Sequence, residues 1–201
     1  MSSYHHGNLR EALIETGIQY VSNNGEATLS LRKISAACGV SHTAAYSHFT
    51  DKEALLSAMR DHVTAQFTET LAQTADRHKA QPDLMDQLGM SYVEFFVRNP
   101  HYFVFLFYRI GATVNLDCLD FHENYQPFEI FKTIALTVLN EHEVPAEEHL
   151  QALLAMWSIV HGLAGIAAIG GVQYSDDWGT LTARILSENT ISNENCAVKK
   201  T

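Results

Sequence analysis

The spacing of apolar residues predicts helices along almost the whole chain. Leu9, Leu13, Gly17 and Val21 recur every four residues, which indicates a first helix from about Gly7 to Asn23. Glycine inside a helix costs about 1 kcal/mol relative to alanine, so we expect another helix to cross closely at Gly17. The same periodicity favours further helices at residues 51–78, 83–98, 128–140, 147–169 and 178–186. The predicted fold class is therefore all-α.

The run His101–Ile110, HYFVFLFYRI, has the highest density of aromatic residues and is harder to assign. Its composition fits a β-strand as well as a helix. The helices expected on both sides, together with Gly111 as a terminator, favour a short helix. Asn99–Pro100 ends the helix before it, because the residue preceding proline is steered away from helical angles. Residues 115–123 are expected to form a loop with a helical start.

Two short helices are predicted between the first helix and the long helix at 51–78. Leu31, Ile34 and Cys38 form one apolar stripe, and Ser30 precedes it as an N-cap. Gly39 follows the stripe, where a left-handed backbone favours glycine. Ser41 is placed to cap the second short helix, and Thr50 with Glu53, three residues later, has the spacing of a capping box for the long helix. Two short helices joined by a glycine-containing turn form a helix-turn-helix, whose second helix enters the DNA major groove.

The segment SLRKISAACGVSHTAAYSHFTDKEALL, residues 30–56, resembles the DNA-binding signature of TetR-family transcriptional regulators. Those proteins carry a Thr/Ser-x-Arg-x-Ile-Ala run, then Gly-Val-Ser, three variable residues, Tyr-x-His-Phe and x-x-Lys-Glu. This chain departs from the pattern at Ser35, where the family usually has alanine, and it has a small pair, Ala44 and Ala45, in the second helix. The resemblance covers about residues 8–60. The alternative is a helical hairpin that serves only as packing.

The resemblance implies a set of residues that contact DNA. They are Ser30, Arg32, Ser41, His42, Thr43, Tyr46, His48 and Lys52. His42 and Thr43, at the exposed start of the second short helix, are candidates for contacts with base edges. Tyr46, His48 and Lys52 match positions that touch phosphates in the family. We expect Ser30 and Arg32 to add phosphate or base contacts.

The net charge of −10 looks wrong for a DNA-binding protein until it is divided along the chain. Residues 1–60 contain five basic and five acidic residues, whereas residues 61–201 contain 8 basic and 18 acidic ones. All of the net negative charge therefore lies outside the proposed DNA-binding part. An acidic body is repelled by the phosphate backbone and leaves a neutral head to approach it.

The helix expected at 147–169 is apolar on nearly all sides. Leu153, Trp157 and Val160 lie on one face, and Ile159 and Ile166 on another. Because a domain of this size offers one core, the second face implies a partner, most simply the same helix of a second subunit. This predicts a homodimer formed through the C-terminal helices, and the operator is then expected to be an inverted repeat.

Trp157-x-x-x-His161-Gly162 resembles a pattern found in one subgroup of TetR-like C-terminal domains. Family members bind a small molecule in that domain, which moves the connecting helix. The residues expected to contact such an effector are Phe103, Phe107, Tyr125, Phe128, Trp157 and His161. A mostly apolar cavity with one or two polar groups is the usual chemistry of a ligand site. The alternative for each is plain core packing.

The predicted organisation is a helix-turn-helix DNA-binding domain at 1–55, a helical effector-binding and dimerisation domain at 56–190, and a polar tail at 191–201. We expect disorder from Ser187 onward. The three cysteines, the lack of a signal peptide and the lack of an apolar run of about 18 residues favour a cytoplasmic protein outside the membrane; the closest run is Ala155–Val172.

The predicted function is a ligand-responsive homodimeric repressor that binds double-stranded DNA, without a cofactor or a metal. An activator of the same fold is the alternative, because the position of the operator decides between the two. A helical enzyme using the C-terminal cavity is a further alternative, since His122, His142 and His149 are accompanied by several glutamates. Their spacing matches no zinc-peptidase or di-iron pattern.

Overall fold

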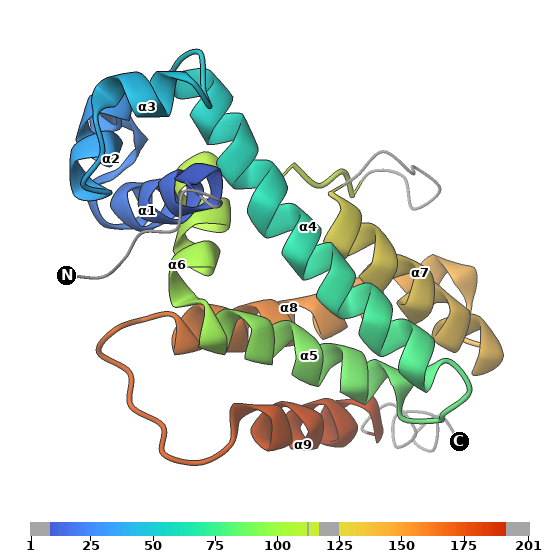
Figure 1. Ribbon diagram of the computed structural model, residues 1–201. Coiled ribbons are helices and arrows are strands. Elements are labelled where there is room, and N and C mark those ends of the chain that lie inside the picture. Colours follow the sequence, from blue (N-terminus) through green and yellow to red (C-terminus); the bar gives the residue numbers. More distant parts are fainter. Residues whose placement is uncertain (1–8, 112, 117–124, 192–201) are drawn as a thin grey trace, which may run out of the picture. The chain divides into compact units, whose positions relative to one another are not determined.

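The computed structural model describes residues 9–111, 113–116 and 125–191 (Figure 1). All regular structure within these ranges is helical, which confirms the all-α prediction. The helices are α1 (Leu9–Asn24), α2 (Leu31–Ala37), α3 (His42–Tyr46), α4 (Lys52–His78), α5 (Leu84–Arg98), α6 (Pro100–Phe103), α7 (Gln126–Glu141), α8 (His149–Ala167) and α9 (Trp178–Ile191). Short 3₁₀ turns occupy Glu26–Thr28 and Ala146–Glu148, and a π-helix occupies Val104–Ile110.

The described residues form two compact units. The first contains residues 9–65 and 101–111, and the second contains 66–100, 113–116 and 125–191. Helix α4 contributes its beginning to the first unit and its remainder to the second. The domain limits 1–55, 56–190 and 191–201 remain a prediction.

The first unit has a small core between α1, α2 and the beginning of α4. Leu13, Ile18 and Ile34 are at most 1% exposed, and Met59 of α4 is fully buried. A Cβ at Gly17 would lie 2.8 Å from the sulfur of Met59. The close helix crossing expected from Gly17 is therefore present.

The caps of α2 and α3 follow the sequence prediction. The Ser30 hydroxyl accepts a hydrogen bond from Lys33 N at 3.3 Å, and the Ser41 hydroxyl accepts one from Ala44 N at 3.2 Å. Gly39 has φ +69° in the turn between the two helices. These contacts fix where α3 begins, because its first free amides have no partner within the helix.

The predicted capping box of Thr50 and Glu53 is wrong. Helix α4 begins at Lys52, and Asp51 Oδ1 accepts the hydrogen bond from Ala54 N at 2.7 Å. Asp51 is therefore the N-cap, and Thr50 lies one residue too early, with its hydroxyl 3.3 Å from Asp51 Oδ2. Both residues are good capping types, and the sequence pattern did not separate them.

The aromatic run after α5 is helical, as favoured, but most of it is a π-helix. Phe103, Phe105 and Leu106 are at most 1% exposed in the first unit. Ser22 of α1 donates a hydrogen bond of 2.8 Å to the carbonyl of His101. The segment ends at Gly111, whose φ is +78°. A π-helix was not predicted, because its i→i+5 hydrogen bonds leave no mark in the apolar periodicity.

The second unit is built on α5, which packs against α8 and α9, with α7 beside α8 (Figure 1). Phe67 of α4 is fully buried, and its ring centroid lies 4.9, 4.8 and 4.7 Å from those of Tyr92, Phe95 and Phe96. A Cβ at Gly89 would clash with Leu186 of α9. The absence of a side chain at Gly89 therefore allows α5 and α9 to approach closely.

Two expectations for the C-terminal part need correction. Residues Ser187–Ile191 belong to α9 instead of a disordered tail, because one face of that helix stays buried through Leu186, which is 5% exposed. Helix α8 begins at His149, after a 3₁₀ turn, whereas Glu147 was expected. Asn115 and Leu116 have no regular structure. The remainder of the predicted loop, 117–123, and the tail from 192 lie outside the described residues.

Helix α8 exposes part of its apolar surface. Leu153, Val160 and Ala164 are fully buried, whereas Ile166 is 46% exposed. The stretch Ala146–Ala167, with mean hydropathy 1.6 in its most apolar window, is long and apolar enough to cross a membrane, and 17% of that window is buried. No apolar run of that length was expected from the sequence. Length and composition alone are weak evidence, because core helices of soluble proteins meet the same criterion.

We expect Phe67→Ala to lower the free energy of unfolding by about 3–5 kcal/mol, because the substitution leaves a cavity among three packed rings. Urea unfolding at fixed protein concentration measures this loss. Phe67→Leu is the matched control and should lose less, because it refills part of the volume. A loss below about 1 kcal/mol for Phe67→Ala would contradict the placement of Phe67 in the core.

Candidate functional site

Helix α3 presents a short polar surface. On α3, His42 and Thr43 are exposed and Tyr46 is 53% exposed; His48, in the turn that follows the helix, is exposed as well. The rings of His42 and Tyr46 meet edge to face with centroids 6.5 Å apart. Ala45 is fully buried, so α3 rests on the core at this residue and its polar side chains face outward.

The N-terminal ends of α2 and α4 supply the other candidate DNA contacts. Ser30 and Ser41 use their hydroxyl oxygens to accept backbone hydrogen bonds, which leaves each hydroxyl proton available for a phosphate. Arg32 is exposed on the first turn of α2. Lys52 is the first residue of α4, and its ammonium lies 3.5 Å from Glu26 Oε1. The pairing of Glu26 with Lys52 was not predicted from the sequence, because 26 positions separate the two residues.

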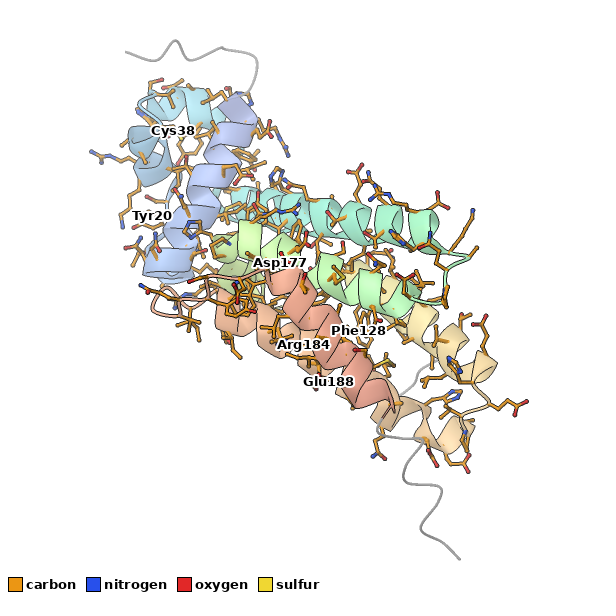
Figure 2. All side chains as sticks on the ribbon, turned by 90° about the horizontal axis from the view of Figure 1, so that it is seen from below. Tyr20, Cys38, Phe128, Asp177, Arg184 and Glu188 are labelled. Atoms are coloured by element: carbon orange, nitrogen blue, oxygen red, sulfur yellow. The ribbon has the colours of Figure 1, made fainter. Side chains whose placement is uncertain are left out.

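Two other basic residues of this unit are held by their neighbours. Lys33 donates to Thr28 O at 2.8 Å and to the Tyr20 hydroxyl at 3.1 Å, and its ammonium also lies over the Tyr20 ring. Arg10 of α1 lies 5.4 Å from the centroid of the Phe49 ring. Figure 2 labels Tyr20 and Cys38, both in this unit. Cys38 is 8% exposed and packs on α1, with its sulfur 3.2 Å from Thr16 Oγ1.

The second unit contains a partly buried aromatic cluster with polar groups. Phe128 and Trp157 have ring centroids 4.9 Å apart, and those of Trp157 and His161 are 5.5 Å apart. The Tyr92 hydroxyl lies 3.0 Å from His161 Nδ1. Tyr125 is close enough to act on the ionisation of Tyr92. We name Tyr92, Tyr125, Phe128, Trp157 and His161 the aromatic cluster.

The structure therefore brings together four of the six predicted effector-binding residues. Phe103 and Phe107 instead belong to the first unit, where their ring centroids are 5.0 Å apart. Tyr92 was missed as a candidate, although it lies within the helix predicted at 83–98. A phenol on an otherwise apolar face is a signal for a buried polar site, because its hydroxyl requires a partner.

Burial governs the ionisation of the aromatic cluster. Burial raises the pKa of Tyr92, which keeps the phenol protonated, although the hydrogen bond from Trp157 opposes this shift. Burial lowers the pKa of His161, so its imidazole is neutral at neutral pH. Two neutral groups therefore share the hydrogen bond between the Tyr92 hydroxyl and His161 Nδ1, and the tautomer of the imidazole decides which of them donates.

A groove lies beside α7 in the same unit. It has a volume of 510 Å³ and is lined mainly by apolar side chains, among them Ala72 and Ala75 of α4, Leu84 of α5, and Ile130 and Ile134 of α7. Glu129 also lines it and forms an ion pair of 2.9 Å with Lys132, whose side chain is 3% exposed. The groove and the aromatic cluster share α7, since Phe128 precedes Glu129.

The histidines considered for an enzyme have structural explanations where they are described. His149, the first residue of α8, donates a hydrogen bond of 2.9 Å from Nε2 to the carbonyl of Val144. His142 is exposed at the end of α7. His122 lies outside the described residues. Within the described ranges, no group of three or more His, Cys, Asp or Glu side chains could hold a metal ion.

Two family models match the chain. Residues 13–59 match the bacterial regulatory proteins of the tetR family. Residues 85–188, more than half of the chain, match the tetracyclin repressor-like C-terminal domain. The chain belongs to the TetR family. It is a DNA-binding transcriptional regulator. Both matched domains are those of transcription factors and not of enzymes.

Solved structures show the same fold. A putative transcriptional regulator from Pseudomonas aeruginosa PAO1 is similar with a TM-score of 0.67 and 15% identity, over 92% of this chain and 90% of that chain. A TetR-family transcriptional regulator from Bordetella parapertussis 12822 has a TM-score of 0.63 and 19% identity, over 90% and 94%. A protein of unknown function from Rhodococcus sp. RHA1 has a TM-score of 0.63 and 20% identity, over 94% and 96%. No curated protein matches the sequence significantly.

We expect His161→Gln to weaken the pH dependence of stability in this TetR-family protein. Because the pKa of His161 is lowered in the folded state, the unfolded chain binds a proton there first as the pH falls. The wild-type free energy of unfolding should therefore decline from about pH 7, through the ordinary histidine pKa of about 6.5, until the folded pKa is reached. Urea unfolding of both proteins between pH 7 and pH 5 tests this.

The exposed His142→Gln variant is the matched control and should keep the wild-type decline. If His161→Gln loses stability with falling pH as steeply as wild type, burial of His161 does not govern this decline.

Proposed function

We propose that this TetR-family protein is a homodimeric repressor that binds an inverted-repeat operator and is released by a small, mostly apolar effector. The observation that supports this most directly is that the chain combines an exposed polar α3, capped at a fixed position, with a partly buried aromatic cluster in a second unit. The first suits base recognition and the second suits ligand binding. Such a regulator would act in the cytoplasm, on chromosomal DNA.

The proposed DNA contacts divide into two kinds. His42 and Thr43 lie at the exposed N-terminal end of α3, where a recognition helix reaches base edges. Tyr46 and His48 contact phosphates from the same region. Lys52 contacts a phosphate together with the N-terminal amides of α4, which attract anions. Ser30, Arg32 and Ser41 complete the proposed interface.

The proposed dimer uses the exposed face of α8. Ala155, Gly162 and Ile166 are exposed along this helix, and small residues allow two helices to approach closely. Helix α9 is next to α8 and presents Arg184 and Glu188 to solvent (Figure 2). A two-fold axis between subunits would place two α3 helices on one duplex, which is why the operator is proposed to be an inverted repeat.

The proposed effector site is the aromatic cluster, with the groove beside α7 as the adjoining apolar space. The cluster carries polar groups at Tyr92, Trp157 and His161 among apolar rings, so the effector would carry a polar group on an apolar body. Helix α4 lines the groove with Ala72 and Ala75, and its first turns, from Lys52, belong to the first unit. A shift of this one helix on effector binding is the proposed route by which DNA affinity falls. Phe103 and Phe107 remain proposed contacts with less support, since they pack in the first unit.

An activator of the same fold would show the same head and the same cluster, and only the position of the operator relative to the promoter distinguishes it. An enzyme using the C-terminal cavity is less well supported, because both family models describe transcriptional regulators.

Selection of binding sites from random duplex DNA, at near-physiological salt, tests the proposed function. Recovery of a short inverted repeat supports a dimeric sequence-specific regulator and supplies an operator. Small apolar compounds can then be screened for release from that operator. Enrichment of a single half-site alone would contradict the dimer, and no enrichment with or without compounds would contradict the proposed head.

We expect substitutions of the proposed DNA contacts in the first unit to separate affinity from specificity. Lys52→Ala should weaken binding to all sequences alike and lower the salt slope of log K by about one. His42→Ala and Thr43→Ala should each relax the preference at one position of each half-site, at a cost of about 1–3 kcal/mol on the selected operator. Fluorescence anisotropy on selected and scrambled duplexes measures both effects. Unchanged binding in all three variants would contradict the proposed contacts.

We expect Ile166→Glu to dissociate the dimer. A charge buried in an apolar helix interface without a partner is strongly unfavourable, so the dissociation constant should rise by at least about tenfold. Sedimentation equilibrium measures it. Thr137→Glu, an exposed change on α7, is the matched control and should leave the dimer intact. An unchanged dissociation constant for Ile166→Glu would place the interface elsewhere.

A further inference from the structure

Glu26 and Lys52 form an ion pair at the part of the head proposed to meet DNA. Glu26 opens the 3₁₀ turn Glu26–Thr28 after α1, and Lys52 is the first residue of α4. Lys52 Nζ lies 3.5 Å from Glu26 Oε1, and the two side chains are 32% and 40% exposed. The pair is therefore partly open to solvent and can be broken by a competing anion.

The position of Lys52 favours an anionic partner. The N-terminal end of a helix carries a partial positive charge, which disfavours a lysine in the first turn. Asp51 is committed to capping, because its Oδ1 accepts the hydrogen bond from Ala54 N at 2.7 Å. Glu26 supplies the opposite charge to the Lys52 ammonium in the free protein. The other nearby ammonium, that of Lys33, is held by Thr28 and Tyr20.

A DNA phosphate would satisfy the same requirement in the complex. It would pair with the Lys52 ammonium and accept from the amides at the start of α4. Glu26 carries no donor for a phosphate and would be left unpaired beside it. The carboxylate and the phosphate thus compete for one lysine.

We propose that Glu26 is an intramolecular competitor of the DNA phosphate, which holds Lys52 in the free protein and lowers its affinity for DNA of any sequence. This inference rests on the proposed phosphate contact of Lys52. Glu26 acts through Lys52 and is a positioning residue. This competition weakens binding of the protein to non-specific DNA, where phosphate contacts supply nearly all of the affinity.

The test is a double-mutant cycle with Glu26→Gln, Lys52→Ala and the combined variant. Binding to the selected operator and to a scrambled duplex is measured by fluorescence anisotropy at several salt concentrations. Glu26→Gln should tighten binding to both duplexes by about two- to fivefold, the range expected for release of an exposed ion pair. In the Lys52→Ala background the same change should have no effect, because the competed lysine is absent.

Glu53→Gln is the matched control. It removes a carboxylate from the first turn of α4, next to Lys52, and this carboxylate forms no ion pair with the described residues. It should tighten binding less than Glu26→Gln. Circular dichroism and urea unfolding establish that each variant is folded before binding is compared.

Three results would overturn the proposal. If Glu26→Gln tightens binding equally with and without Lys52, the carboxylate repels DNA directly and does not compete for the lysine. If Lys52→Ala weakens binding but Glu26→Gln changes nothing, the ion pair is incidental and the proposed function stands. If Lys52→Ala leaves binding and salt slope unchanged, the phosphate contact itself is wrong, and both the contact and this inference fail.

Discussion

The continuity of α4 is the constraint on which the rest of the structure depends. This helix has 27 residues without a proline or glycine, and at about 1.5 Å per residue it extends about 40 Å. Its first turns bury Leu55 and Met59 in the first unit, and Phe67 and Leu71 are buried farther along, in the second. Helix α4 therefore contributes buried side chains to both units along one uninterrupted helix.

Short helices such as α2 and α3 depend on their ends for stability. An isolated helix of five or seven residues is unstable in water, so tertiary contacts and caps must hold it. Ser30, Ser41 and Asp51 fix the first residue of α2, α3 and α4, and Ala45 anchors α3 to the core. The exposed side chains of α3 are consequently presented from a defined backbone, which is what recognition of base edges requires.

The sequence was sufficient for features that depend on near neighbours. It predicted the two serine caps, the Gly39 turn and the all-helical fold, because these follow from spacings of a few residues. It failed where two nearby residues could serve the same role, as with Thr50 and Asp51, and where hydrogen bonding changes without a change of pattern, as in the π-helix Val104–Ile110. The partners of Tyr92 and Lys52 were also missed, because His161 and Glu26 lie far from them in sequence.

The distribution of charge gives the two units different relations to DNA. Residues 61–201 carry the whole net charge of −10, which opposes any close approach of the body to phosphates. Affinity must then come from a few contacts on a head whose basic and acidic residues balance. Lys33 and Arg10 are engaged with aromatic rings, and Lys52 is engaged with Glu26. Arg32 and Arg60 stay exposed in the same unit. With few basic side chains in this unit, the proposed base contacts of α3 would have to supply most of the specificity for one operator. A displacement of α3 would then remove contacts that the phosphate backbone alone does not replace.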